Sequence, residues 1–235
     1  STVVVTPSWA NKEVKTHADE KGCWELQITT PAASFEEYTL TLTDGEQSVT
    51  LQHLLIGEVW LCAGQSNMVM PLNGFDYCPI SDSNNVIADA PNHPGIRMVT
   101  IKPTVKLSPQ EYAEGSWQQP TTENAPKFSA AAYHYALTLQ RTLQIPIGVI
   151  TCAWGGSRVE GWLPKEILQT YKDEDLTLIG SDKTPVYLQS MLMYNGILYP
   201  CHKYTIKGFI WYQGESNVRS SRTYAERLAT MVKHW

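Results

Sequence analysis

Three apolar runs, each followed by a small polar cluster, constrain the fold of this chain more than any other feature. The runs span residues 58–63, 147–153 and 206–212. Continuous apolar runs of this length are typical of strands that are buried on both faces of a parallel sheet. Helical patterns lie between them at residues 129–143 and 188–198, the first delimited by Ser129 as a cap and by Pro146. The sequence therefore predicts an α/β fold built on a parallel sheet.

The beginning of the chain follows a different pattern. Strand-like segments at residues 23–29, 38–43 and 48–55 are separated by turn residues, and Asp44-Gly45 between the last two is a hairpin signal. The pattern changes near residues 55–58. We therefore expect a partial all-β, sandwich-like segment at residues 1–56 and an α/β domain at residues 57–235.

A long polar stretch interrupts the α/β pattern. Residues 72–126 are rich in Pro, Asn, Asp and Gly and contain one strand candidate, residues 96–101. Loops of this length inside a domain are usually functional or mobile. We therefore expect a long loop region here.

The composition excludes several classes of protein. A formal net charge of −5 and a pI near 5.7 leave no basic field for phosphates, so nucleic acid is not an expected partner. With 43% hydrophobic and 17% charged residues and no apolar run of about 18 residues, the pattern is that of a globular protein without a membrane span. The five cysteines are widely spaced without a C-x-x-C pair, so we expect no metal site.

The polar clusters have the residue types that acyl transfer needs. Ligands of open parallel sheets bind beyond the carboxyl ends of the strands, so the three clusters should meet at one edge. Ser66 follows the first run, next to Gly64 and a helical pattern, where backbone N–H groups favour negative charge. The Gly155-Gly156 pair after the second run lets a backbone N–H reach an oxyanion.

The third cluster supplies an amide and a carboxylate. Gln213 can donate to an oxyanion, and Glu215 can orient a histidine. Each cluster alone also has a structural interpretation: Ser66 as a helix cap, the glycine pair as a tight turn, and the third cluster as a solvated loop. The coincidence of all three at strand ends favours a catalytic site.

The motifs at the strand ends resemble those of the sialate O-acetylesterase family. The strings are GEVWLCAGQSNM at residues 57–68, WGGS at 154–157 and GFIWYQGESN at 208–217. Shorter similar strings follow the family's order at residues 146–150, 160–162 and 194–200. The resemblance covers residues 50–235 approximately.

The resemblance implies a fold and a reaction. The fold is a flavodoxin-like SGNH hydrolase domain, a three-layer sandwich around a parallel sheet, and the reaction removes acetyl groups from sugar hydroxyls without a metal or other cofactor. By resemblance, Ser66 is the nucleophile, Gly155 or Gly156 and Gln213 form the oxyanion hole, and Glu215 is the acid of the triad. Weaker expectations of substrate contact fall on Gln65, Asn67, Trp154 and Asn217.

The resemblance also implies the biological setting. The substrate is an acetylated carbohydrate, with sialic acid as the first expectation and acetylxylan as the alternative. No charged-then-apolar leader precedes Ser1, so a periplasmic or secreted location follows only from the resemblance.

The general base is not among the matched motifs. The family's Asp-x-x-His block follows the Gln-Gly-Glu-Ser motif at a greater distance than this chain extends. The histidines fit a base poorly by their positions; they are His17, His53, His93, His134, His202 and His234. We therefore expect that the C-terminal catalytic block is absent, and that the chain is either part of an esterase or a non-catalytic carbohydrate-binding SGNH remnant.

Two other nucleophile arrangements are disfavoured. An α/β-hydrolase lipase has a Gly-x-Ser-x-Gly elbow, whereas this chain has Met68 at the last position. A thiol nucleophile at Cys62 or Cys152 would lie inside an apolar strand, where cysteine is usually inert.

Overall fold

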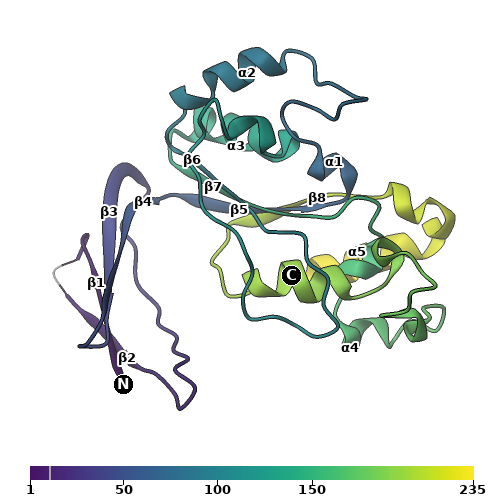
Figure 1. Ribbon diagram of the computed structural model, residues 1–235, viewed down its shortest axis with the longest axis horizontal. Coiled ribbons are helices and arrows are strands. Elements are labelled where there is room, and N and C mark those ends of the chain that lie inside the picture. The colour runs from purple at the N-terminus through teal and green to yellow at the C-terminus, as the bar shows by residue number, and fades with distance from the viewer. Residues whose placement is uncertain (11) are drawn as a thin grey trace. The chain divides into compact units, whose positions relative to one another are not determined.

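The computed structural model of the protein describes residues 1–10 and 12–235. The chain forms two compact units, Ser1–Glu58 with Leu143–Pro146, and Val59–Thr142 with Ile147–Trp235 (Figure 1). The division into a sandwich-like segment and a hydrolase domain at residues 56 and 57 stays a prediction. Among the described residues, no helix is both long and apolar enough to cross a membrane.

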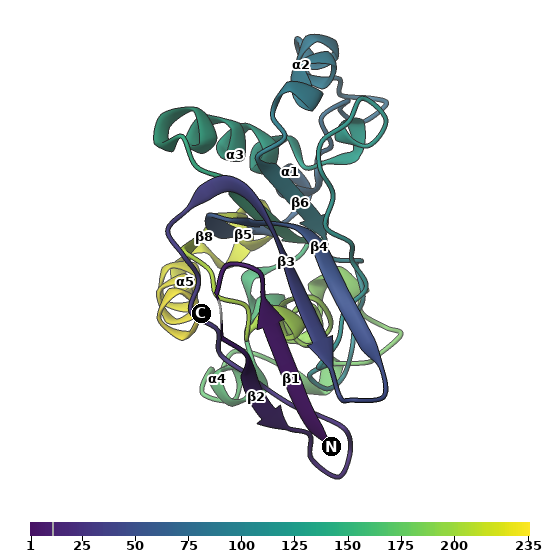
Figure 2. The same ribbon diagram turned by 90° about the vertical axis from the view of Figure 1, so that its left-hand side faces the viewer.

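The first unit contains an antiparallel sheet with the strand order β2-β1-β3-β4 (Figure 2). Its strands are β1 (Thr2–Pro7), β2 (Val14–His17), β3 (Ser34–Thr43) and β4 (Ser48–Ile56). The hairpin predicted at Asp44-Gly45 joins β3 to β4, and Thr43 pairs with Ser48 beside the turn. The hydrophobic side chains that this sheet fully buries are Val3, Val5 and Tyr38.

One predicted strand of the first unit is wrong. Residues 23–29 are extended but belong to no strand, and most of them are exposed. Its hydrogen bonds include one from the Trp9 indole to the carbonyl of Thr29, at 3.0 Å, and one from the N–H of Cys23 to Oδ1 of Asp19, at 2.8 Å. β3 pairs with β1 on one side and with β4 on the other, so the sheet forms without residues 23–29.

The second unit contains a sheet with the strand order β6-β7-β5-β8. Its strands are β5 (Glu58–Gly64), β6 (Ile96–Thr100), β7 (Ile147–Ala153) and β8 (Gly208–Tyr212). β5 pairs with β8 and β6 with β7, both in parallel. The three apolar runs and the strand candidate at residues 96–101 are therefore confirmed as strands of one α/β unit.

Helices cover both faces of this sheet. They are α1 (Ser66–Val69), α2 (Ser83–Asp89), α3 (Ala130–Leu143), α4 (Lys165–Leu168) and α5 (Ser221–His234). Figures 1 and 2 show α2 and α3 over one face and α4 and α5 over the other. The predicted helix at residues 129–143 is confirmed as α3, and its predicted apolar face is buried at Tyr133, Ala136, Leu137 and Gln140.

The predicted helix at residues 188–198 is only partly correct. Regular helical turns begin at Leu192 and continue as a π-helix, Tyr194–Leu198, followed by a short 3₁₀ turn, Tyr199–Cys201. Met191 has a φ of 71°, a left-handed conformation that no α-helix accommodates. The residues before it therefore form a separate 3₁₀ turn, Val186–Leu188.

Candidate active site

The three polar clusters meet at one edge of the parallel sheet. The backbone N–H of Trp154, just after β7, donates to the carbonyl of Gly64 at 3.0 Å. The N–H of Gln65, just after β5, donates to the carbonyl of Tyr212 at the end of β8, at 3.1 Å. The carboxyl ends of β7, β5 and β8 are therefore in register, as expected for a ligand site on this fold.

Ser66 stands at a sharp turn from β5 into α1. Gly64 has a φ of 153°, and a Cβ placed on it would lie 2.1 Å from the carbonyl oxygen of Tyr212, so only glycine fits here. The N-cap of α1 is Gln65, and Ser66 is already the first helical residue. The structural interpretation of Ser66 as the N-cap of this helix is therefore wrong, because Gln65 occupies the cap position.

The hydroxyl of Ser66 is free to react. The side chain is partly exposed, and no hydrogen bond from its Oγ is found in residues 1–10 and 12–235. Its backbone N–H lies in the first turn of α1, where helical N–H groups have no intrahelical partner.

The glycine pair presents further unused donors. Ser157 N–H donates to the Trp154 carbonyl at 3.2 Å and closes a tight turn over Gly155 and Gly156. Within the described part of the chain, no group accepts a hydrogen bond from the N–H of either glycine. Gly156 has a φ of 74°, and the ring of Tyr187 packs so closely that an added Cβ would lie 3.0 Å from it. Gly155 is exposed with open space around it, as an oxyanion donor requires.

Gln213 differs from its predicted role. Its Nε2 donates to the carbonyl of Ser157 at 3.0 Å and to Oδ1 of Asn217 at 2.8 Å, so both amide protons are engaged. Reversing the amide would turn its oxygen toward these two acceptors. Oε1 is buried and has no partner among the described residues. In this arrangement Gln213 joins two strand-end loops and does not offer a donor to an oxyanion.

Asn217 also differs from its predicted role. It is 1% exposed. Its Oδ1 accepts from the N–H of Val159 at 2.9 Å, and its Nδ2 donates to Oε2 of Glu160 at 3.0 Å. A substrate does not reach a side chain that is this deeply buried, so Asn217 positions the loops instead.

The other predicted contacts lie close to Ser66 in sequence or space. Gln65 is 3% exposed, and its Oε1 accepts from the N–H groups of Gly214 and Ser216, both at 3.3 Å. Asn67 is partly exposed, and its amide donates to the exposed carboxylate of Glu215. Trp154 packs against the hydrophobic core. Glu215 and Asn67 therefore remain available to solvent, whereas Gln65 holds the third loop in place.

An ionic cluster with a buried centre at Glu160, Glu174 and Arg227 was not predicted. Its members are Arg158, Glu160, Asp173, Glu174 and Arg227. The guanidinium of Arg227, 2% exposed, pairs with fully buried Glu160 and lies 2.7 Å from Asp173. Arg158 pairs with Glu174 at 2.9 Å. Glu160 thus links α5 to Asn217 and to the turn that follows Gly156.

The charge of Arg227 is secured by its neighbours. Burial alone would lower the pKa of Arg227, but the hydrogen bond and charge of Glu160, with Asp173 and Glu174, raise the pKa above its usual value. The one signal in the sequence was Glu160 itself, an acidic residue in a string that resembles the family motif. Nothing in the sequence connected it to Arg227.

No histidine of the second unit is placed to accept the proton of Ser66. The carbonyl of His93 accepts from the N–H of Ile96 at the start of β6, so His93 lies at the opposite edge of the sheet. His202 likewise precedes β8. His134 is exposed on α3, and His234 ends α5 with its Nε2 3.3 Å from the Tyr194 hydroxyl. In the described residues, no histidine hydrogen-bonds to Ser66 or Glu215.

The buried thiols are inert in this environment. Burial raises the pKa of Cys62 to about 12. The pKa of Cys152 is also raised, first by its hydrogen bond with Cys201 and then by burial. At neutral pH neither thiol forms the thiolate that a nucleophile requires.

Comparison with known proteins identifies the family of the chain. Residues 56–235 match the family described as "Carbohydrate esterase, sialic acid-specific acetylesterase", and the chain belongs to this family. The sialate O-acetylesterases of Pongo abelii and Homo sapiens are each 27% identical to it over 234 residues, which cover 94% of this chain and 43% of theirs.

A solved structure shows the same architecture. The crystal structure of a carbohydrate acetylesterase from Xanthomonas citri superposes with a TM-score of 0.84 at 29% identity, and the match covers 100% of this chain and 50% of that one. The chain therefore spans less than half the length of the curated relatives and half that of the solved one.

Proposed function

We propose that this chain carries the nucleophile of a carbohydrate O-acetylesterase of the flavodoxin-like SGNH type, with O-acetylated sialic acid as the substrate class. The observation that carries the proposal is Ser66, a free hydroxyl at a turn where only glycine fits at position 64. The unused N–H groups of Ser66, Gly155 and Gly156 beside it support the same reaction. Membership of the esterase family agrees with it.

The proposed reaction has two steps. Ser66 Oγ attacks the acetyl carbonyl carbon, its proton passes to a general base, and the oxyanion is held by backbone N–H groups of Ser66 and the Gly155-Gly156 turn. The sugar oxygen leaves with a proton, which gives an acetyl-enzyme. Water then attacks the acetyl-enzyme and releases acetate and free Ser66.

The general base is the part that the present geometry does not supply. We propose that it is a histidine outside these 235 residues, oriented by Glu215, whose exposed carboxylate is held by Asn67. The greater length of the relatives is consistent with this. A periplasmic or secreted location is part of the same proposal, because it rests on the family.

The proposal is tested by replacing Ser66 and restoring a base from solution. Imidazole added to the 235-residue protein should stimulate the hydrolysis of an aryl acetate and of O-acetylated sialic acid. The Ser66→Ala variant should lose about 10³-fold or more of this activity, since the nucleophile is removed. Ser216→Ala, a serine of the neighbouring loop, is the matched control and should keep it.

Two outcomes separate the candidate functions. An acetyl group found on Ser66 by mass spectrometry after a single turnover supports the esterase. Equal hydrolysis by the parent and by Ser66→Ala, at every imidazole concentration, would instead support the non-catalytic carbohydrate-binding alternative.

A further inference from the structure

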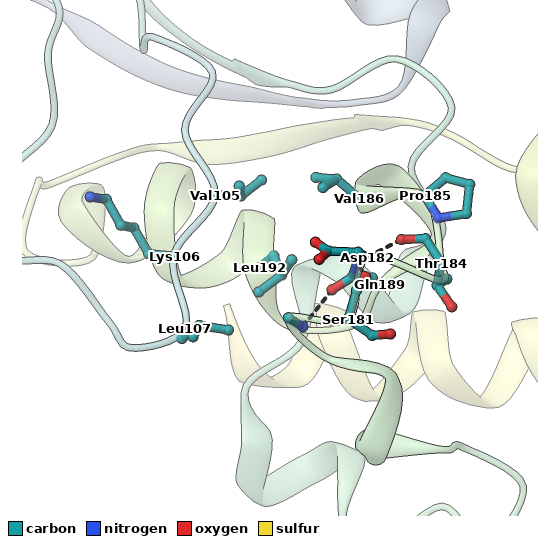
Figure 3. A pocket seen from close by; sticks show the side chains of 11 residues that line it. Val105, Lys106, Leu107, Ser181, Asp182, Thr184, Pro185, Val186, Gln189 and Leu192 are labelled. Atoms are coloured by element: carbon teal, nitrogen blue, oxygen red, sulfur yellow. Dashed lines mark hydrogen bonds between the residues drawn. The ribbon is translucent and has the colours of Figure 1, made fainter.

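A cavity of about 410 Å³ lies between the loop that follows β6 and the segment around residues 180–192 (Figure 3). Apolar side chains from both segments line it, including Val105, Val186 and Leu192. Asp182 and Thr184 add polar groups. A mixed lining of this kind is typical of small-molecule sites, in which a few polar groups set the orientation of the ligand.

The polar side of the cavity is preformed around one buried amide. Gln189 is 3% exposed, and its Oε1 accepts from the N–H of Gly180 at 2.6 Å. Its Nε2 donates to the carbonyls of Ser181 and Thr184, at 2.9 and 2.7 Å. The loop that carries Asp182 is thus held from inside, and less ordering is needed when a ligand binds.

The cavity adjoins the glycine turn of the candidate active site. Val186 lines the cavity, and Tyr187, the next residue, packs its ring against Gly156. The Cα atoms of Val186 and Tyr187 are about 3.8 Å apart, as in any trans peptide. The carbonyl of Leu188 accepts from Nε of Arg158 at 3.0 Å, so the same short segment is tied to the chain just after the turn. This segment therefore contacts the glycine turn through Tyr187 and lines the cavity through Val186.

The charge in the cavity selects hydroxyl groups. Figure 3 shows the carboxylate of Asp182 directed toward the side chain of Leu192, whereas the ammonium of Lys106 points away from the other lining residues. An ionised carboxylate is only an acceptor of hydrogen bonds, so it binds O–H donors and repels anions. Apolar walls beside it suit the C–H faces of a sugar.

We propose that this cavity is a subsite for the hydroxyl-bearing, uncharged portion of the sugar whose acetyl ester is cleaved at Ser66. The inference rests on the proposed function for the identity of the sugar. Asp182 accepts hydrogen bonds from sugar hydroxyls, Val186 and Leu192 contact C–H groups, and any carboxylate of the sugar points out of the cavity. Asp182 is thereby a specificity-determining residue and takes no part in bond cleavage.

The experiment measures binding, not turnover. The Ser66→Ala protein is titrated calorimetrically with sialic acid and with its uncharged carboxamide. Introducing Asp182→Ala into the Ser66→Ala protein should weaken binding of the carboxamide about tenfold or more, because charge-assisted hydrogen bonds are lost. Adding Val186→Trp should abolish binding by filling the cavity. Glu226→Gln, which removes an exposed carboxylate on α5, is the matched control and should leave affinity unchanged.

The two ligands test the placement of the charge. The carboxamide should bind at least as tightly as the free acid. Binding that is unaffected by both Asp182→Ala and Val186→Trp, or that requires the carboxylate of the sugar, would overturn the subsite.

The result is separable from the esterase assignment. If sugar binding depends on Asp182 but aryl acetate hydrolysis does not depend on Ser66, the subsite proposal is supported and the esterase proposal is rejected. If hydrolysis depends on Ser66 but sugar binding does not depend on Asp182, the esterase proposal is supported and the subsite proposal is rejected.

Discussion

The strand-end site and the ionic cluster use polar groups in opposite ways. At the strand ends, the hydroxyl of Ser66 and the N–H groups of Gly155 and Gly156 have no partner within the described residues. In the cluster, the carboxylate of Glu160 and the guanidinium of Arg227 are buried and bonded to each other. Unpaired groups at a solvent-accessible turn are ready to bind a reacting carbonyl, whereas paired groups in the interior fix the backbone that carries them.

The two regions are joined through two amides. Asn217 bonds to Glu160 on one side and to Gln213 on the other, and Gln213 reaches the carbonyl of Ser157. The cluster therefore acts on the site by position and not by contact. The donors and the hydroxyl that have no protein partner at the strand ends are therefore the groups that we assign to substrate.

The largest expected effect comes from breaking the cluster. Arg227→Met removes the cation that bonds to the buried carboxylate of Glu160 and leaves it only the longer ion pair with Arg158, at 3.8 Å, so we expect the free energy of unfolding to fall by about 3 kcal/mol. Chemical denaturation measures this loss. The double variant Glu160→Leu with Arg227→Met removes both charges and should be more stable than Arg227→Met alone. A double variant that is less stable than the single one would show that the pair is not the source of the loss.

A smaller effect is expected at the glycine turn. Gly156→Ala forces a Cβ into a conformation with a φ of 74° and against Tyr187, which should cost about 1–2 kcal/mol. Esterase activity should fall with it, because the turn that carries the N–H donors shifts. Gly155→Ala is the matched control: its Cβ meets no atom within 4 Å, and its N–H is retained. Equal loss of activity in both variants would contradict the role of the turn geometry.

The smallest expected effect is at the buried thiol of β5. With its pKa raised to about 12, the Cys62 side chain stays protonated as the pH rises from neutral to about 9, and it should resist alkylation by iodoacetamide. Exposed Cys23 and Cys78 should react faster over the same range, because the reagent reaches them from solvent. Peptide mass spectrometry reads each site, and unfolding in guanidinium should make Cys62 react. Rapid alkylation of native Cys62 would return it to the list of candidate nucleophiles.

The α/β unit and the meeting of three strand ends could be predicted because each depends on local pattern and on a general property of parallel sheets. Ser66 needed only a strand, a glycine and a helix start in succession. The hydrogen-bonding roles of Gln213 and Asn217 could not be predicted, because their partners lie more than fifty residues away in sequence. A charged residue such as Glu160 is normally expected at the surface, and only its tertiary partner explains its burial.

The misassigned segments fail for related reasons. Residues 23–29 have strand-like alternation, but they pair with no strand of the sheet β2-β1-β3-β4. The helix expected from residue 188 starts later because Met191 is left-handed. In both cases the local pattern was compatible with the predicted element, and contacts with distant segments decided against it.

Arg227 has a consequence for the order in which the protein folds during synthesis. The carboxylates of Glu160 and Glu174 leave the ribosome well before the guanidinium that neutralises them, because Arg227 lies in α5, more than fifty residues further along the chain. Until α5 emerges, Arg158 is the only cation of the cluster that has been synthesised. Burying both acidic groups is unfavourable at that stage, so we expect the turn after β7 to close only after α5 has been synthesised.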